Sequence, residues 1–111
     1  MNQGTPIASH TVTATAALTA KRAVNIAGAV PAAAATCLGP ARTAAAIGQT
    51  TTVDYAGTAP WESGGAFSAG AYLELDASGR VVVFSAGVKV GKALEASSGA
   101  GQFPEVLILQ N

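Results

Sequence analysis

The sequence predicts an all-β protein, a small antiparallel β-barrel or sandwich with an extended N-terminal arm. Glycine and proline recur so often after Lys21 that no long amphipathic helix fits between them. Short β-branched and aliphatic runs alternate with Gly-rich turns through the second half, a pattern typical of small all-β folds. A chain of 111 residues is long enough for one such domain with a modest core.

The first 20 residues are rich in threonine and alanine. Thr11, Thr13 and Thr15 alternate with Val and Ala at a period of two, and the β-branched bias suits a β-strand. Because few large apolar side chains are present there, we expect residues 1–20 to form an extended arm rather than a core strand. Such an arm would pair with a sheet edge, in its own subunit or in another one. Residues 21–111 would then form the barrel or sandwich domain.

The middle of the chain carries weaker signals. Alanine gives residues 32–35 and 41–47 a high helix propensity, but neither has a full apolar stripe, so at most a turn or two of helix is expected. Strands are expected at residues 23–26, 36–38 and 50–55.

The second half predicts two antiparallel strand pairs. Residues 71–75 and 80–84 flank a turn that begins with Asp76 and ends with Gly79, which indicates a β-hairpin. Residues 88–95 and 105–109 form the second pair, separated by a loop of Ser, Gly and Ala.

Composition excludes several classes of function. Of 55 apolar residues 26 are alanine, and charged residues make up only 11% with a net charge of zero. The longest basic run is Lys21-Arg22, too short for the phosphate contacts of a nucleic-acid-binding protein. The uncharged stretch 23–41 is interrupted by Asn, Gly and Pro, and the N-terminus lacks the basic start of a signal peptide. We therefore expect no nucleic-acid partner, no membrane anchor and synthesis in the cytoplasm.

No catalytic, cofactor-binding or metal-binding residue is predicted. Cys37 is the single cysteine, so it can form neither an internal disulfide nor a zinc cluster, and we expect it to be a small buried residue. His10 lies in the arm, and Gly91-Lys92 lacks the flanking residues of a phosphate loop. A carboxylate pair such as Glu74 with Glu95 has no support from its spacing.

The candidate interface residues come from two places. Residues 55–67 hold the single tryptophan between turn-forming residues, and Trp61 fits either an interface anchor or a plug at one end of a barrel. A thin core and few charges also favour association of identical subunits about a rotation axis. The candidate capsid or subunit interface residues are Thr11, Thr13, Thr15, Tyr55 and Trp61.

Residues 24–109 resemble the capsid decoration, or cement, proteins of tailed bacteriophages. The most specific part is residues 69–83, an Ala-Gly pair followed by a strand, a Gly-ended turn and a second strand. Residues 90–96 are similar to the Gly-x-Ala-Leu-x-Ala strand of that family, and a terminal strand follows at 105–109. Residues 1–20 fall outside the resemblance.

The resemblance implies a non-enzymatic virion protein without a cofactor. Such a protein binds the outer surface of an HK97-type shell, contacts the major capsid protein and stabilises the shell, often as a homotrimer. A dimer is the alternative oligomer, and strand addition by the arm is the expected mode of contact. The alternative function is a small carbohydrate-binding or adhesion β-module that would use Trp61, Tyr55 and Tyr72 as a stacking platform.

Overall fold

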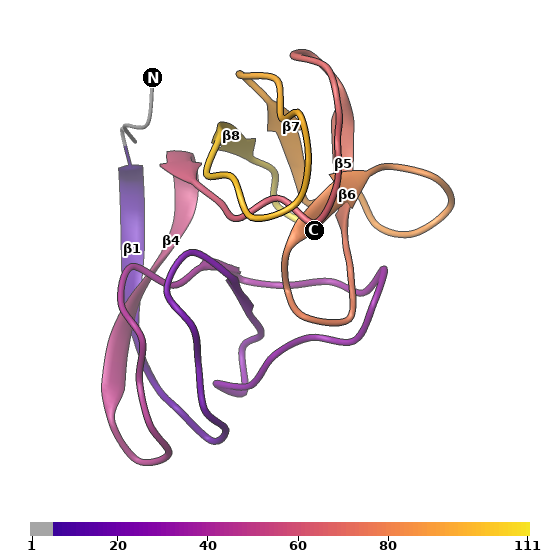
Figure 1. The fold of residues 1–111 in the computed structure, drawn as a ribbon. Helices are drawn as coiled ribbons and strands as arrows, with labels where there is room; N and C mark the ends of the chain where they lie inside the picture. Colours follow the sequence, from indigo (N-terminus) through magenta and orange to yellow (C-terminus); the bar gives the residue numbers. More distant parts are fainter. Residues whose placement is uncertain (1–5) are drawn as a thin grey trace.

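The computed structural model describes residues 6–111, and every regular element in this part of the chain is a β-strand (Figure 1). The strands are β1 (Pro6–Thr13), β2 (Ala23–Val24), β3 (Gly39–Pro40), β4 (Thr50–Pro60), β5 (Tyr72–Leu75), β6 (Val81–Val83), β7 (Gly91–Ala93) and β8 (Glu105–Ile108). Six of them form an antiparallel sheet in the order β1-β4-β8-β7-β5-β6, and β2 pairs with β3. The predicted all-β class is confirmed, although the six-stranded sheet is open rather than closed into a barrel.

β4 connects two parts of the molecule. Its first part, residues 50–57, pairs with β1, whereas Thr58–Pro60 pairs with β8 on the other side. Gly57 lies between these parts with a φ of 92°, a conformation that L side chains rarely adopt. Because the pairing partner changes there, we divide the described chain into a loop lobe, residues 6–57, and a sheet lobe, residues 58–111.

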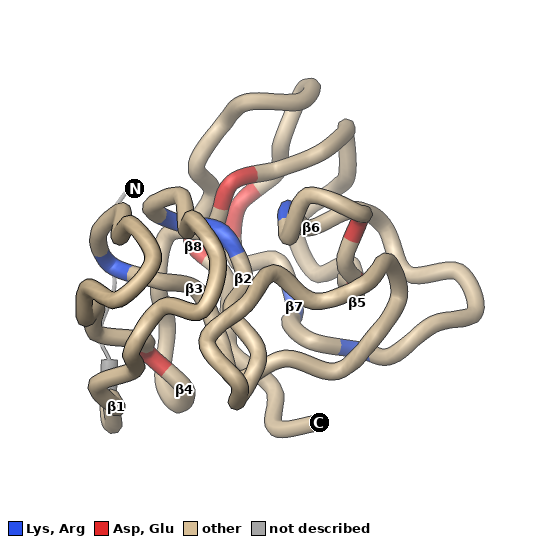
Figure 2. The backbone as a smooth tube through the Cα atoms, turned by 90° about the horizontal axis from the view of Figure 1, so that it is seen from below, with Lys and Arg blue, Asp and Glu red and all other residues tan. Residues whose placement is uncertain are grey.

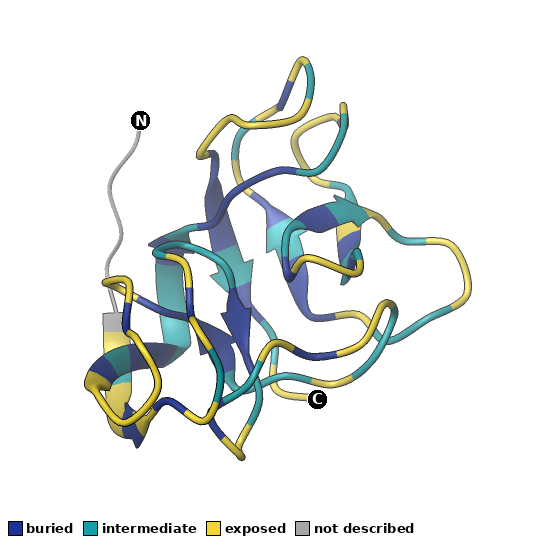
Figure 3. Cartoon of the chain, turned by 60° about the horizontal axis from the view of Figure 1, so that its bottom comes forward, coloured by how far each residue is buried: buried dark blue, intermediate teal, exposed yellow. Residues whose placement is uncertain are grey.

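The sheet lobe has a core of large side chains. Trp61, Leu73, Leu75 and Val106 are almost fully buried and belong to one cluster of apolar residues. Ala23 joins this cluster from β2, and Cys37 packs against it in a half-buried position. The strands of this lobe are largely buried while most loops between them are exposed (Figure 3).

The loop lobe has its own core of smaller side chains. Its cluster consists of Val12, Ala14, Leu18, Val24, Ala41, Ala45 and Val53. The Thr-rich segment pairs with a sheet edge, as expected, because β1 is the end strand beside β4. It also supplies core residues, because alternation along β1 turns Val12 inward and Leu18 follows it into the same cluster. The division of the chain at residue 20 stays a prediction.

The strand pairs predicted in the second half are confirmed. β5 and β6 form the hairpin, and Gly79 in its turn has a φ of 80°. The Asp76 carboxylate accepts the backbone N–H groups of Ser78 and Arg80, which fixes the turn. β7 and β8 form the second pair.

The alanine-rich segments form turns and bridges. Ala35 N–H donates to the Ala32 carbonyl in a turn, and Ala45 forms a bridge with Leu18. Within residues 6–111 no helix is long and apolar enough to cross a membrane.

Candidate interaction surfaces

β1 presents an open edge of the six-stranded sheet. Ala14 exchanges backbone hydrogen bonds with Gln49 and Gly48 on the β4 side, whereas Thr15 N–H donates to the Gly28 carbonyl on the other side. Backbone groups of successive strand residues point to opposite sides, so those of Thr11 and Ser9 point away from β4, as those of Thr15 do. Thr52 of β4 is opposite Thr11, and its carbonyl accepts Arg42 N–H on the side of β4 away from β1. Thr11 and Thr52 therefore do not hydrogen-bond to each other, and the backbone groups of Thr11 point outward.

A turn at residues 25–29 closes one end of this edge. Asn25 Oδ1 accepts the N–H groups of Ala27 and Ala29, which fixes the turn, and Gly28 follows with a φ of 85°. A side chain at Gly28 would overlap the carbonyl oxygen of Thr13, so only glycine allows this close approach. The edge is therefore capped at Thr13 and open towards the beginning of β1.

The other end of the sheet is closed at Val81. Val81 in β6 forms a parallel bridge with Ser63, in which Val81 N–H donates to the Glu62 carbonyl at 2.9 Å. Gly64 N–H donates back to the Val81 carbonyl at 2.8 Å. Of the two end strands, β1 is thus the one with unpaired backbone groups along several residues of the described chain.

β1 itself carries no Asp, Glu, Lys or Arg within its described residues, and the surface at its capped end is partly aliphatic. Thr11, Thr13 and Thr15 are all exposed, and their role as interface residues stays a prediction. Ile26 in the capping turn and Ile47 beside Gly48 are 87% and 72% exposed. Both isoleucines lie on turns that hydrogen-bond to the Ala14–Thr15 backbone, so they flank the same end of β1. Large aliphatic side chains so exposed are typical of surfaces that contact another protein.

Trp61 is a core residue rather than an interface anchor, the other role that its sequence context allows. Its side chain is fully buried, and Nε1 donates to the Gly79 carbonyl at 3.1 Å. The indole therefore anchors the β5–β6 turn to the end of β4 and offers no surface to a partner.

The three aromatic residues of the alternative carbohydrate-binding function do not form one platform. Trp61 is buried, and Tyr55 is half-buried beside a shallow hollow of about 250 Å³ that Cys37 and Asn111 also line. Tyr72 lies on β5 under the ammonium groups of two lysines. No stacking surface is shared among them.

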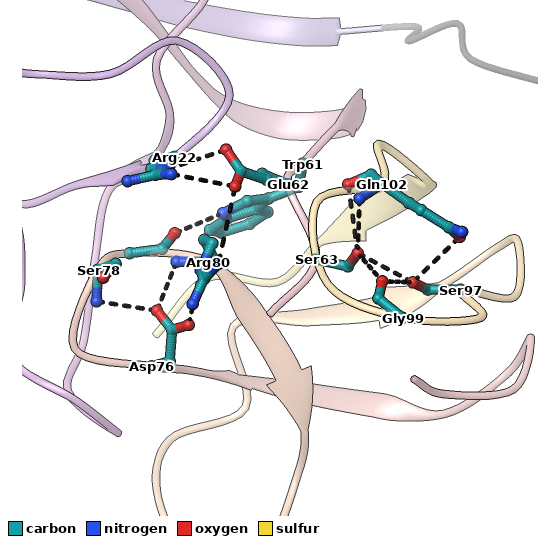
Figure 4. Close-up of polar contacts among 11 residues, drawn as sticks. Arg22, Trp61, Glu62, Ser63, Asp76, Ser78, Arg80, Ser97, Gly99 and Gln102 are labelled. Carbon is teal, nitrogen blue, oxygen red and sulfur yellow. Dashed lines mark hydrogen bonds and ion pairs between the residues drawn. The ribbon is translucent and has the colours of Figure 1, made fainter. Parts of the chain in front are cut away.

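A cluster of arginine–carboxylate pairs lies where the lobes meet, and its Arg22–Glu62 pair joins them (Figure 4). Arg22 makes a bidentate contact with Glu62 at 2.9 and 3.1 Å, and this hydrogen bonding raises the pKa of the Arg22 guanidinium. Arg80 binds Asp76 at 2.9 Å and reaches Glu62 at 4.0 Å. Glu62 is buried, so its charge needs these partners, and the cluster has a structural role.

Buried serines form a second polar cluster beside the first (Figure 4). Ser97 Oγ donates to Ser63 Oγ at 2.9 Å, and Ser63 Oγ donates to the Gly99 carbonyl at 2.9 Å. Gln102 Oε1 accepts the Ser98 N–H and so fixes the same loop. These hydroxyls contact carbonyl, amide and hydroxyl groups of the loop.

The residues weighed for chemistry lie apart. His10 is exposed on β1, opposite Val53. The Glu74 carboxylate accepts the N–H groups of Ser85 and Gly87, which lower its pKa, and Glu95 accepts the Glu105 N–H. Among residues 6–111 no group of three His, Cys, Asp or Glu side chains is arranged to hold a metal ion.

The Cys37 thiol is half-buried, and burial raises its pKa to about 12. Its backbone N–H donates to Asn111 Oδ1 at 2.7 Å, which ties the end of the chain to the segment before β3. A thiol with so high a pKa is almost entirely protonated at neutral pH, so it acts as a packing group rather than a nucleophile.

The sequence analysis did not identify four surface residues that stand out in the structure. They are Lys89 and Lys92, which lie over the ring of Tyr72, and the exposed Ile26 and Ile47. The lysines meet Tyr72 because β5 pairs with β7, two strands that are not adjacent in sequence, and no local pattern reveals that pairing. Ile26 and Ile47 were detectable as isolated large side chains within segments of Ala and Gly.

The comparisons with known proteins decide the family. A model of the phage cement protein family matches residues 1–109. The chain belongs to this family. It is therefore a structural, capsid-associated component of a bacteriophage virion. The match includes residues 1–20, so the Thr-rich segment belongs to the shared family pattern, contrary to the sequence resemblance that left it out.

A similar solved structure supports the fold. It is the crystal structure of the head fiber gp8.5 N base in bacteriophage phi29, with a TM-score of 0.74 and 19% sequence identity. The alignment covers 92% of this chain and 93% of that chain. At this identity the likeness concerns the fold alone. A search of curated proteins found no match.

Proposed function

We propose that this cement protein binds the outer surface of an HK97-type shell, contacts the major capsid protein there and stabilises the shell as a homotrimer. Its role is structural and non-catalytic, and it is made in the host cytoplasm, where shells assemble. The observation that carries the proposal, beside family membership, is the uncharged open edge of β1. Soluble proteins normally protect such an edge with charges, prolines or a covering segment.

The proposed contact is strand addition. The outward backbone groups of Ser9 and Thr11 offer hydrogen-bond donors and acceptors to an extended segment of the major capsid protein or of a neighbouring copy. The side chains of Thr11, Thr13 and Thr15 lie beside this edge and would contact that segment, and Ile26 and Ile47 would extend the contact at its capped end.

The experiment compares two substitutions at one position. Thr11→Pro removes an outward N–H and leaves the pairing with β4 in place, whereas Thr11→Val removes only the hydroxyl. Each protein is incubated with purified shells of its own phage that lack it, and bound protein is measured after sedimentation. We expect Thr11→Val to bind nearly as wild type and Thr11→Pro to bind at least about tenfold more weakly, the loss of one to two hydrogen bonds.

Controls separate the parts of the proposal. Circular dichroism and thermal unfolding must show that Thr11→Pro is folded. If it is folded and binds as wild type, strand addition at β1 is wrong. If wild-type protein does not sediment with shells, the shell-binding function is wrong. The mass of the free protein by light scattering tests the trimer, and a mass equal to the 10.8 kDa of one chain would contradict it.

A further inference from the structure

The three lysines of this protein differ from its arginines in their partners. Each of the three arginines contacts a carboxylate, the pairs being Arg22–Glu62, Arg42–Asp54 and Arg80–Asp76. No ion pair joins a lysine to a carboxylate within residues 6–111. The lysine ammonium groups lie over aromatic rings instead. Charged residues are sparse along the chain as a whole (Figure 2), so these unpaired charges stand out.

Two of the lysines share one ring. Lys89 Nζ lies 4.4 Å from the ring centre of Tyr72 and 5.1 Å from that of Phe84, and Lys92 Nζ lies 5.5 Å from the Tyr72 ring. Strand pairing sets this arrangement, because Tyr72 in β5 is opposite Lys92 in β7 and Phe84 N–H donates to the Tyr72 carbonyl. We call these four residues the lysine–aromatic patch.

The patch is accessible and has an apolar margin. Lys89 is exposed, and Tyr72 is 43% exposed. Leu107 in β8 is opposite Lys92 on the other side and is half-buried. The patch belongs to the end of the sheet farthest in strand order from β1, so it can meet a different partner segment.

The patch lacks an anion of its own. A cation over an exposed ring gains only a modest attraction, and each ammonium has three N–H donors, none of which contacts a carboxylate within residues 6–111. The nearby carboxylate, that of Glu74, accepts the N–H groups of Ser85 and Gly87. An added carboxylate near Tyr72 would interact with two ammonium groups whose charges are not paired with a carboxylate of residues 6–111.

We propose that the lysine–aromatic patch binds a carboxylate-bearing segment of the shell protein, an Asp or Glu side chain flanked by apolar residues. The inference rests on the proposed shell binding and names the chemistry of one contact. Charge complementarity selects an acidic partner, and the apolar side chain of Leu107 beside Lys92 favours a peptide. Two lysines in a chain of zero net charge are too few to hold a phosphate backbone.

The test measures shell binding of a charge-deleted double variant, K89A/K92A, as a function of salt. We expect its binding to be about tenfold weaker than wild type at low salt, since each rim ion pair contributes modestly. We also expect its dependence on NaCl to be flatter, because two charges at the contact are gone. K89R/K92R should retain most of the binding. Lys21→Ala is the matched control, since Lys21 lies over a single ring, Phe103, at 4.9 Å.

The outcomes separate this inference from the proposed function. If wild type binds shells and K89A/K92A binds equally well with the same salt dependence, the patch is not a contact. If Lys21→Ala loses as much binding as the double variant, the effect is one of overall charge and the inference is wrong. Binding to duplex DNA or to a glycan array that K89A/K92A abolishes, with shell binding unchanged, would assign the patch to another partner.

Discussion

The two lobes reach stability by different means. The sheet lobe buries Trp61, Phe67 and two leucines in one cluster, whereas Leu18 is the only buried residue larger than valine in the core of the loop lobe. The loop lobe depends more on hydrogen bonds between loops, such as Leu18 N–H to the Ala45 carbonyl at 2.8 Å. Because burial of apolar area is the main stabilising contribution, the loop lobe is the weaker unit.

This difference corresponds to the placement of the proposed strand-addition contact. The weaker lobe carries the open edge of β1 and the exposed side chains of Ile26 and Ile47. A partner that pairs with β1 would bury apolar area where the isolated chain has least, and so would stabilise the loop lobe by mass action. The sheet lobe would then be stable in the free protein, whereas the loop lobe would gain part of its stability when the partner binds.

The largest expected effect is at the core of the sheet lobe. Trp61→Ala should lower the free energy of unfolding by about 3–5 kcal/mol, because it leaves a large cavity and removes the hydrogen bond to Gly79. Urea denaturation followed by circular dichroism measures the change. A decrease in the free energy of unfolding below about 1 kcal/mol would show that the larger core of the sheet lobe does not make it the more stable lobe.

A smaller loss is expected from the largest core residue of the loop lobe. Leu18→Ala should cost about 2–3 kcal/mol, at the lower end for buried leucine because small neighbours can close around the site. Thermal and urea unfolding of both variants give the ranking. A Leu18→Ala loss equal to or greater than that of Trp61→Ala would invert the comparison.

Local opening distinguishes the lobes without substitution. The amide hydrogens of Thr15 and Leu18, bonded to the carbonyls of Gly28 and Ala45, should exchange at least about tenfold faster than that of Val90, bonded to the Leu73 carbonyl. Native-state hydrogen exchange by NMR measures these rates. Equal protection at all three amides would mean that the lobes open only together.

The smallest effect concerns pH. Hydrogen bonds from Ser85 and Gly87 lower the pKa of Glu74 from its ordinary value of 4.5, so the ionised form is favoured in the folded state. The stabilisation is therefore present above pH 4.5 and disappears as the pH falls through the lowered pKa. Glu74→Gln should be less stable than wild type at pH 7, and the two unfolding midpoints should converge in acid. Parallel curves at every pH would contradict this.

The sequence predicted local structure better than long-range pairing. The β5–β6 hairpin was predictable because Asp76 and Gly79 specify the turn within the segment itself. The place of β1 was only partly predictable, because Val12 and Leu18 become core residues only when Val24, Ala41 and Ala45 reach them from distant loops. The strand predicted at residues 36–38 begins instead at Gly39, where a Cβ would overlap the Asp54 carbonyl and only glycine permits the approach to β4.

The candidate contacts divide in the same way. Thr11, Thr13 and Thr15 were identifiable from their period of two, and all three are exposed, although β1 ends at Thr13. The sequence did not predict whether Trp61 is buried or exposed. Its burial depends on packing within the apolar cluster, and its Nε1 donates to the Gly79 carbonyl, 18 residues away. The lysine–aromatic patch depends on pairing between β5 and β7, which a single sequence does not specify.

The turn that holds Gly28 sets the position at which an added strand must end. An incoming segment can extend past Ser9 towards the beginning of β1, but it meets the 25–29 turn at Thr13. One end of the added strand is thus fixed relative to this chain, and a shift of register by two residues towards the cap is sterically prevented. If strand addition joins the chain to its shell, every copy would sit at the same height and tilt, and a lattice of identical copies needs that uniformity.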